Sequence, residues 1–190
     1  MKPFILASGS PRRKELLEQA NISFTVQTSD IDETINPALS PEQFVQSLAL
    51  QKAEAVFNSN QDAVVLGSDT VVVLEGQILG KPADRDHAKE MLTALSGKQH
   101  SVITGVAILS SEQQKTFFVE TRVHFWELSN AEIERYLDTN EPFDKAGAYG
   151  IQGFGATLVR EIAGDYFAVV GLPLALTVRE LSHFGITPNI

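Results

Sequence analysis

Residues 63–74 read AVVLGSDTVVVL, and this stretch indicates the fold class. The apolar run at its start, Ala63 to Leu66, is typical of a strand buried on both faces, as in a parallel or mixed sheet. Polar residues Gly67 to Thr70 interrupt the run, and Val71 to Leu74 continue it. Because an ionisable side chain is costly to bury without partners, Asp69 is a candidate metal ligand or general base. An exposed aspartate at a strand end is the less favoured interpretation, since apolar residues continue beyond it.

Strands and helices alternate on both sides of this stretch. Further strands are predicted at residues 4–7, 101–109, 116–127, 157–162 and 166–170. Helices are predicted from Pro11, from Pro41, at 84–96, from Asn130 and at 173–184. The helices after Ser40 and Ser129 each begin with a capping box, in which Gln or Glu follows the serine after three residues. This order predicts an α/β fold with a mixed sheet and two lobes around a cleft, in a single domain over residues 1–190.

Composition excludes several classes of protein. With 43% hydrophobic and 21% charged residues, the 190-residue chain does not resemble a disordered, collagenous or coiled-coil protein. It has 15 Lys and Arg against 24 Asp and Glu, a net charge of −9, which argues against nucleic acid as a partner. Cysteine is absent, so disulfides, thiolate zinc sites and cysteine nucleophiles are excluded. No apolar run approaches the roughly 18 residues that span a membrane, and we expect a cytoplasmic protein with no membrane partner.

Two familiar nucleotide and metal motifs are not matched. Residues 76–82, GQILGKP, resemble a P-loop, but the glycine spacing is one residue short and Pro82 follows the lysine where Ser or Thr is required. The four histidines, His87, His100, His124 and His183, show no ligand spacing, and we expect surface or capping roles for them.

The segment SGSPRR, residues 8–13, is a candidate anion site. A strand ends there and a helix begins with Ser10 as N-cap and Pro11 at the first position. Arg12 and Arg13 are unfavourable for the helix dipole, but an anionic ligand would offset that cost, and guanidinium groups suit phosphate. A surface helix start with incidental charges explains the residues equally well.

Three further features are weaker when each is taken alone. Lys52, Lys81 and Lys145 are separate charges, and the acidic residues 30–33 suit either metal binding or a solvated loop. Residues 144–155, DKAGAYGIQGFG, contain four glycines that permit close approach of the backbone to a ligand. Gln152 in that loop can read a base edge, because its amide both donates and accepts hydrogen bonds. Together these features indicate a nucleotide or another phosphate ester.

The sequence also resembles the Maf (septum formation inhibitor-like) family. The matching pieces occur in order over nearly the whole chain: LASGSPRRKELL, LALQKA, VVLGSDTVV, GKP, LSGKQHSVITGVAI, DKAGAYGIQGFGATLV and VVGLPL. The resemblance implies an elongated mixed sheet similar to that of inosine triphosphate pyrophosphatases. It also implies hydrolysis of a nucleoside triphosphate to the monophosphate and pyrophosphate, with Mg²⁺ or Mn²⁺ as the cofactor, by a homodimer.

The resemblance implies roles for individual residues. Asp69 matches the catalytic base, and Asp69 and Glu33 match the metal ligands. The phosphate site is implied at Glu33, Lys52 and Lys81, and the phosphate-binding first turn at Ser8, Arg12 and Arg13. Which carboxylate is the base and which is the metal ligand does not follow from the sequence.

Substrate choice is implied by two positions. The resemblance implies that Thr70 and Gln152 match the branch that acts on dTTP, UTP and modified pyrimidine nucleotides, rather than the branch that acts on 7-methyl-GTP. A third position, Arg12 or Arg13, is also associated with substrate choice in the family. Ser68 stands where the pyrimidine branch commonly has alanine. The expected role is nucleotide-pool cleansing or cell-division arrest, and the alternative is a non-catalytic regulator of septum formation that binds a nucleotide or a protein.

Overall fold

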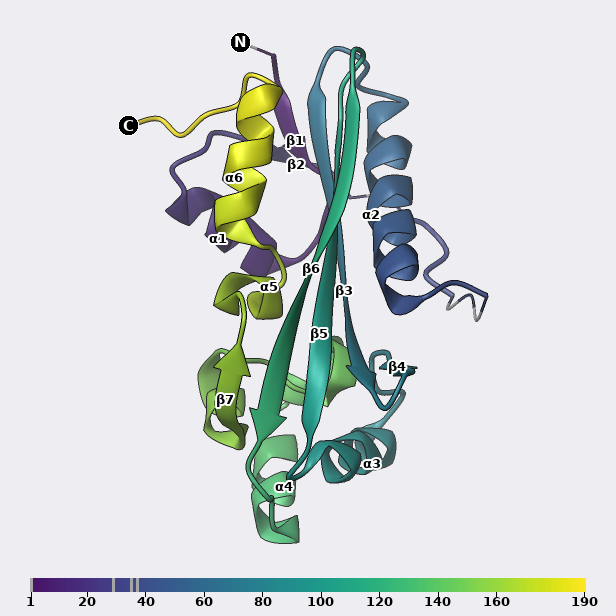
Figure 1. Ribbon diagram of the computed structural model, residues 1–190, viewed down its shortest axis with the longest axis vertical. Helices are drawn as coiled ribbons and strands as arrows, with labels where there is room; N and C mark the ends of the chain where they lie inside the picture. Colours follow the sequence, from purple (N-terminus) through teal and green to yellow (C-terminus); the bar gives the residue numbers. More distant parts are fainter. Residues whose placement is uncertain (1, 29, 35, 37) are drawn as a thin grey trace. The chain divides into compact units, whose positions relative to one another are not determined.

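The computed structural model describes residues 2–28, 30–34, 36 and 38–190 (Figure 1). Its strands are β1 (Phe4–Leu6), β2 (Thr25–Val26), β3 (Val64–Leu74), β4 (Gln77–Leu79), β5 (Gln99–Leu109), β6 (Gln114–Phe125) and β7 (Val159–Ala163). Its helices are α1 (Pro11–Gln19), α2 (Pro41–Phe57), α3 (Arg85–Leu95), α4 (Asn130–Leu137), α5 (Tyr166–Val170) and α6 (Leu174–His183). Short 3-10 helices η1 (Glu141–Asp144), η2 (Ala146–Ala148) and η3 (Gly153–Leu158) lie between α4 and β7.

The strands form one seven-stranded sheet with the order β2-β1-β3-β5-β6-β7, and β4 pairs with β3 outside this path. Strand β1 runs parallel to β2 and to β3. Strand β4 is antiparallel to β3, and β7 is antiparallel to β6. The predicted α/β class with a mixed sheet is therefore confirmed.

The chain divides into two compact units that alternate along the sequence. Unit 1 contains residues 1–69, 104–119 and 171–190, and unit 2 contains residues 70–103 and 120–170. Strands β3, β5 and β6 contribute residues to both units. This division agrees with the predicted two lobes, while the single domain over residues 1–190 stays a prediction.

In unit 1, helix α2 packs unusually closely against the sheet. A Cβ atom at Gly67 would collide with the backbone of α2 at Ala49, and one at Gly105 would lie 2.5 Å from the carbonyl oxygen of Val45. Glycine at these two positions therefore permits the helix to approach β3 and β5. Figure 1 shows α2 on one side of these strands and α1 and α6 on the other side.

In unit 2, helices α3 and α4 are joined by ion pairs. Glu134 of α4 accepts from Lys89 at 2.6 Å and from Arg85 at 2.7 Å. Apolar side chains of both helices share a core cluster with Phe125 of β6 and Tyr149. This core supports the segment of 3-10 helices that follows α4.

The predicted strand with Asp69 inside it is confirmed: β3 continues through residues 67–70, where Ser68 and Asp69 find partners within unit 1. The structure corrects one predicted element. Residues 166–170 form helix α5 rather than a strand: the Asp165 carboxylate accepts hydrogen bonds from the backbone N–H groups of Phe167 and Ala168 at the start of the helix. A short apolar run does not by itself distinguish a strand from a helix.

The predicted helix starts are confirmed. Both capping boxes form, Ser40 with Gln43 and Ser129 with Glu132. In each, the serine side chain accepts from the backbone N–H of the later residue, and the side chain of that residue accepts from the serine backbone N–H. Among the described residues, no helix has the length and apolar character needed to cross a membrane.

Candidate active site

The close contact between α2 and β3 places Lys52 beside Asp69. The Lys52 Nζ atom lies 2.7 Å from Asp69 Oδ1 and 2.7 Å from Glu33 Oε1. The side chains of Lys52 and Asp69 are each 12% exposed, whereas that of Glu33 is 46% exposed. One partly buried ammonium group thus holds two carboxylates together, at the residues for which catalysis was predicted.

Arg13 adds a buried cation to unit 1. Its Nε donates to the carbonyl oxygen of Gly171 at 2.7 Å, and its Nη1 donates to Ser8 Oγ at 3.2 Å. Burial lowers the pKa of Arg13 from its ordinary value, while the charges of Asp69 and Glu33 act in the opposite direction. An arginine stays protonated in proteins, so its charge is held within electrostatic reach of both carboxylates.

The start of helix α1 has the features of an anion-binding helix terminus. Ser10 is the N-cap and Pro11 the first helical residue, as predicted. Within the part of the chain that the structure describes, the Ser10 side chain makes no capping hydrogen bond, and residues 11–14 contain no acidic side chain. The first turn therefore offers backbone N–H groups and the charges of Arg12 and Arg13, with no carboxylate of its own.

Ser68 has a structural role in unit 1. It is fully buried, and its Oγ lies 2.9 Å from the carbonyl oxygen of Gly105 and 3.3 Å from that of Gly171, so its single O–H donates chiefly to the nearer Gly105. Neighbouring side chains on a strand point to opposite faces, so Ser68 and Asp69 do not share a face. The hydroxyl links β3 to β5 and to the segment that also holds Arg13.

The predicted site residues fall in both units. Unit 1 brings together Ser8, Arg12, Arg13, Glu33, Lys52 and Asp69, whereas unit 2 contains Thr70, Lys81 and Gln152. Thr70 is partly buried, and Lys81 and Gln152 are exposed. The turn that carries Lys81 is tied to the glycine loop, because Gly147 N donates to the carbonyl oxygen of Gly80 at 3.0 Å.

Lys145 is held by its own loop. Its Nζ donates to the carbonyl oxygen of Glu141 at 2.7 Å and forms an ion pair with Asp144 at 2.6 Å. The side chain is 16% exposed. Its contacts indicate that Lys145 supports the loop between α4 and β7.

The chain matches a known protein family over nearly its whole length. The model of a family described as Maf-like protein matches residues 3–184. The chain belongs to the Maf family. The dTTP/UTP pyrophosphatase of Bacillus cereus (strain G9842) is 58% identical over 186 residues, which cover 98% of this chain and 97% of that protein. The dTTP/UTP pyrophosphatase of Halalkalibacterium halodurans is 57% identical over 185 residues, 97% of each chain.

A solved structure supports the fold of this Maf protein. The Staphylococcus aureus Ham1 protein superposes with a TM-score of 0.50 at 14% sequence identity, covering 83% of this chain and 80% of that one. At this level of identity the likeness concerns the fold alone, and it agrees with the predicted α/β architecture.

The carboxylates of Asp69 and Glu33 suit a divalent cation whose remaining ligands are phosphate oxygens of a substrate and waters. Among the described residues, no three His, Asp or Glu side chains gather into a metal site. Asp69 and Glu33 nevertheless converge on Lys52, and Mg²⁺ is commonly held by one or two carboxylates with phosphate oxygens and waters completing its shell. The donor set of unit 1 thus suits Mg²⁺ or Mn²⁺ only together with a phosphate ligand.

His100 departs from the predicted surface or capping role of the histidines. It is 3% exposed, its Nε2 lies 2.7 Å from the Tyr149 hydroxyl, and its ring meets Phe125 edge-on. Burial lowers the pKa of His100 to about 4, so the ring is neutral at pH 7. The sequence did contain a signal for this burial: His100 and Val102 are two residues apart on a strand, so their side chains lie on the same face, and Val102 is buried. His87 does cap: its Nδ1 accepts from Ala83 N at 3.1 Å.

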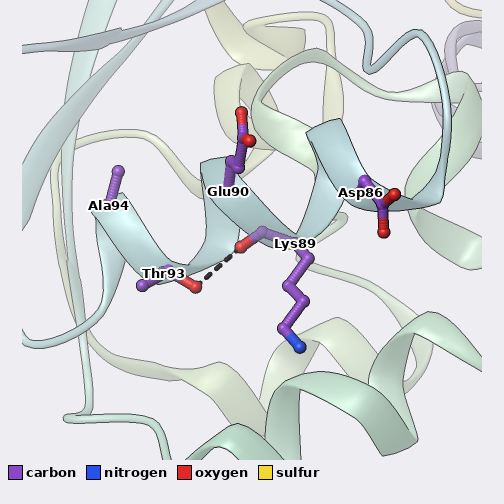
Figure 2. Close-up of a pocket in the computed structure, with 5 residues that line it drawn as sticks. All are labelled: Asp86, Lys89, Glu90, Thr93 and Ala94. Carbon is purple, nitrogen blue, oxygen red and sulfur yellow. Dashed lines mark hydrogen bonds between the residues drawn. The ribbon is translucent and has the colours of Figure 1, made fainter.

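A surface hollow of unit 2 lies along one face of α3 (Figure 2). Its lining residues all belong to that helix: Asp86, Lys89, Glu90, Thr93 and Ala94. Figure 2 shows Lys89 and Glu90 pointing in different directions. The Thr93 hydroxyl donates to the Lys89 carbonyl oxygen at 2.7 Å, the contact drawn there as a dashed line. The hollow contains none of the predicted site residues, and we assign no ligand to it.

Proposed function

We propose that this chain hydrolyses dTTP and UTP, and modified pyrimidine nucleotides of the same shape, to the nucleoside monophosphate and pyrophosphate. The observation that carries the proposal is the arrangement of Asp69 and Glu33 on the partly buried ammonium group of Lys52, with the Arg13 charge nearby. Relatives that are 57–58% identical over nearly their full length bear the name of this activity.

The proposed reaction is attack of water on the α-phosphorus. Asp69 takes the proton from the attacking water, a P–O bond forms, and the bond to the bridging oxygen of the leaving pyrophosphate breaks. Lys52 holds the Asp69 carboxylate in place through its 2.7 Å contact, so the base is positioned before substrate arrives. Glu33, which is more exposed than Asp69, is proposed as the second carboxylate of the cation site.

The leaving pyrophosphate gains one negative charge, on the oxygen that bridged it to the α-phosphorus, and this charge adds to those already present on its phosphates. In unit 1, Arg12, Arg13 and Lys52 are proposed to neutralise these charges, and in unit 2 Lys81 is proposed as a further phosphate ligand. The segment of residues 8–13 that leads into α1 supplies backbone N–H donors at every position except Pro11. A divalent cation bound by Asp69 and Glu33 would withdraw charge from the phosphate oxygens. Because the net charge of the chain is −9, the basic groups of unit 1, Arg12, Arg13 and Lys52, are important for attracting an anionic substrate.

Base selection is proposed to depend on Thr70 and Gln152. Uracil and thymine present a carbonyl acceptor beside an N–H donor on the same edge, and one glutamine amide can satisfy both. Gln152 is exposed and lies between two glycines, Gly150 and Gly153, so its side chain is available to a ligand of unit 2.

The decisive experiment is a panel of nucleotides. Pyrophosphate release from dTTP, UTP, CTP and 7-methyl-GTP, with Mg²⁺ and a coupled inorganic pyrophosphatase, gives relative kcat/KM values. The proposal expects dTTP and UTP to be preferred, and cleavage of 7-methyl-GTP alone, or of no nucleotide, would contradict it. The homodimer and the cytoplasmic location stay predictions, which light scattering and cell fractionation would test.

A further inference from the structure

The loop that carries Gln152 is anchored at both ends and exposed at its tip. Ile151 and Gly155 are buried, whereas Gln152, Gly153 and Phe154 are exposed, Phe154 with 65% of its surface. An exposed tip on a glycine-rich loop would ordinarily sample many conformations, because glycine restricts the backbone little. What holds this tip therefore decides where Gln152 lies.

Two side chains bind backbone N–H groups on either side of Gln152. The Tyr136 hydroxyl of α4 accepts from Gly150 N at 3.1 Å. The Glu141 carboxylate accepts from Phe154 N through Oε1 at 2.8 Å and from Gly155 N through Oε2 at 3.1 Å. All these groups lie in unit 2. The peptide groups before and after Gln152 are thus both bonded to the segment that ends α4 and begins η1.

The backbone of the loop is shaped to this arrangement. Gly153 has a φ of +64°, and a Cβ atom there would collide with the Glu141 carboxylate. A Cβ atom at Gly155 would collide with the carbonyl oxygen of Gly150 and lie 2.8 Å from the Tyr136 hydroxyl. The two ends of the loop therefore touch, and the glycines make room for the two side chains that hold it.

The Tyr136 side chain is in the state that its bond requires. Burial raises the pKa of Tyr136, and the charge of the nearby Glu141 raises it further, so the hydroxyl stays protonated. Glu141 as a carboxylate offers two acceptor oxygens to two N–H donors. Charge-assisted bonds of this kind are stronger than neutral ones.

We propose that Tyr136 and Glu141 are positioning residues for base selection, which hold Gln152 where its amide meets the edge of a pyrimidine base. This inference rests on the proposed function. Selection by hydrogen bonds requires a donor and acceptor placed within a fraction of an ångström, and a loop tip reaches that precision only when its backbone is fixed. Neither residue touches the reacting phosphate in this account.

The test compares Glu141→Gln and Tyr136→Phe with the exposed-residue controls Glu161→Gln and Tyr166→Phe. Each of the first pair should raise KM for UTP and dTTP by about 5-fold while kcat changes less than about 2-fold, since one hydrogen bond of ordinary strength is lost. Preference for UTP over CTP should fall by a similar factor, because cytosine presents a donor and an acceptor in the opposite order on that edge. The controls should leave both quantities unchanged.

A double-substitution experiment separates positioning from mere support of the fold. In a Gln152→Ala background, Glu141→Gln should produce no further loss of UTP preference, because the residue through which it acts is gone. Equal losses in both backgrounds, or a fall in kcat for every nucleotide with unchanged preference, would overturn the inference while leaving the pyrophosphatase proposal intact. Failure of the unsubstituted protein to cleave any nucleotide would overturn both.

Discussion

Lys52 Nζ lies 2.7 Å from Asp69 Oδ1, and this ion pair joins helix α2 to strand β3 in the interior of unit 1. The same ammonium group lies 2.7 Å from Glu33. Two carboxylates that would otherwise repel each other are thereby held together beside Arg13. The contact links the packing of the fold directly to the proposed chemistry.

Replacing the partly buried ammonium group should remove both activity and stability. Lys52→Met leaves Asp69 buried without its partner, which costs on the order of 3 kcal/mol of the free energy of unfolding. It should also lower kcat/KM for UTP by about 100-fold or more, because a charge that stabilises the transition state is lost. Urea unfolding and steady-state kinetics measure the two effects. Unchanged kinetics in Lys52→Met would remove this residue from the mechanism.

The glycines under α2 should be essential for the ion pair. In Gly67→Ala the added Cβ meets the α2 backbone, and such overpacking costs about 1–3 kcal/mol. The helix must move outward, so the activity should fall as well. Gly80→Ala is the matched control for stability, because a Cβ there meets no described atom within 4 Å. Equal unfolding free energies for the two variants would contradict the close-packing argument.

Ser68→Ala should affect stability and not substrate choice. The substitution removes the hydroxyl that lies within hydrogen-bond distance of the Gly105 and Gly171 carbonyl oxygens, with a loss of about 1 kcal/mol in the free energy of unfolding. The ratio of kcat/KM for dTTP to that for 7-methyl-GTP should stay the same, since Ser68 and Asp69 face opposite sides of β3. A changed ratio would show that Ser68 acts on the substrate after all.

Acid should destabilise the protein through His100. Burial, with a smaller effect from the charge of His124, lowers its pKa to about 4 in the folded state, against about 6.5 in the unfolded chain. Above pH 6.5 the His100 ring is neutral in both the folded and the unfolded chain. As the pH falls below 6.5, the unfolded chain binds a proton at this ring and the folded chain does not. The free energy of unfolding therefore decreases until about pH 4, where the folded chain binds the proton as well. The loss amounts to roughly 3 kcal/mol over that window.

Urea unfolding at pH 7 and pH 5 checks this expectation with two variants. His100→Gln should have a smaller drop in stability between the two pH values than the unsubstituted protein has. His87→Gln, which alters an exposed histidine, should retain the full drop. The same drop in all three proteins would assign the acid sensitivity to other groups.

The sequence alone predicts the fold class and the central carboxylate for clear physical reasons. Long apolar runs separated by capped helices specify α/β, and Asp69 is conspicuous because it interrupts such a run. Helix α5 was predicted as a strand because a run of five residues is too short for its periodicity to distinguish a helix from a strand. The interaction that favours the helix is the hydrogen bond from Phe167 N to the Asp165 carboxylate, which caps the start of the helix.

Long-range contacts are what the sequence does not reveal. Lys52 and Asp69 are 17 positions apart on different elements, and their meeting depends on how closely α2 packs against β3. Tyr136 and Glu141 were missed because they bind backbone N–H groups, which every loop possesses. The conspicuous feature near them was the glycine pattern of residues 150–155, which indicates a tight loop without saying what holds it.

The most direct test of the account is pyrophosphate release from dTTP and UTP by Asp69→Asn, measured against the exposed control Asp86→Asn. Asparagine keeps the size of the side chain but accepts a proton far less readily. The account predicts that Asp69→Asn lowers kcat by about 100-fold or more, as expected for loss of a general base, while Asp86→Asn retains the full rate. Retention of full activity by Asp69→Asn in a folded protein would contradict the central role of the carboxylate that Lys52 holds.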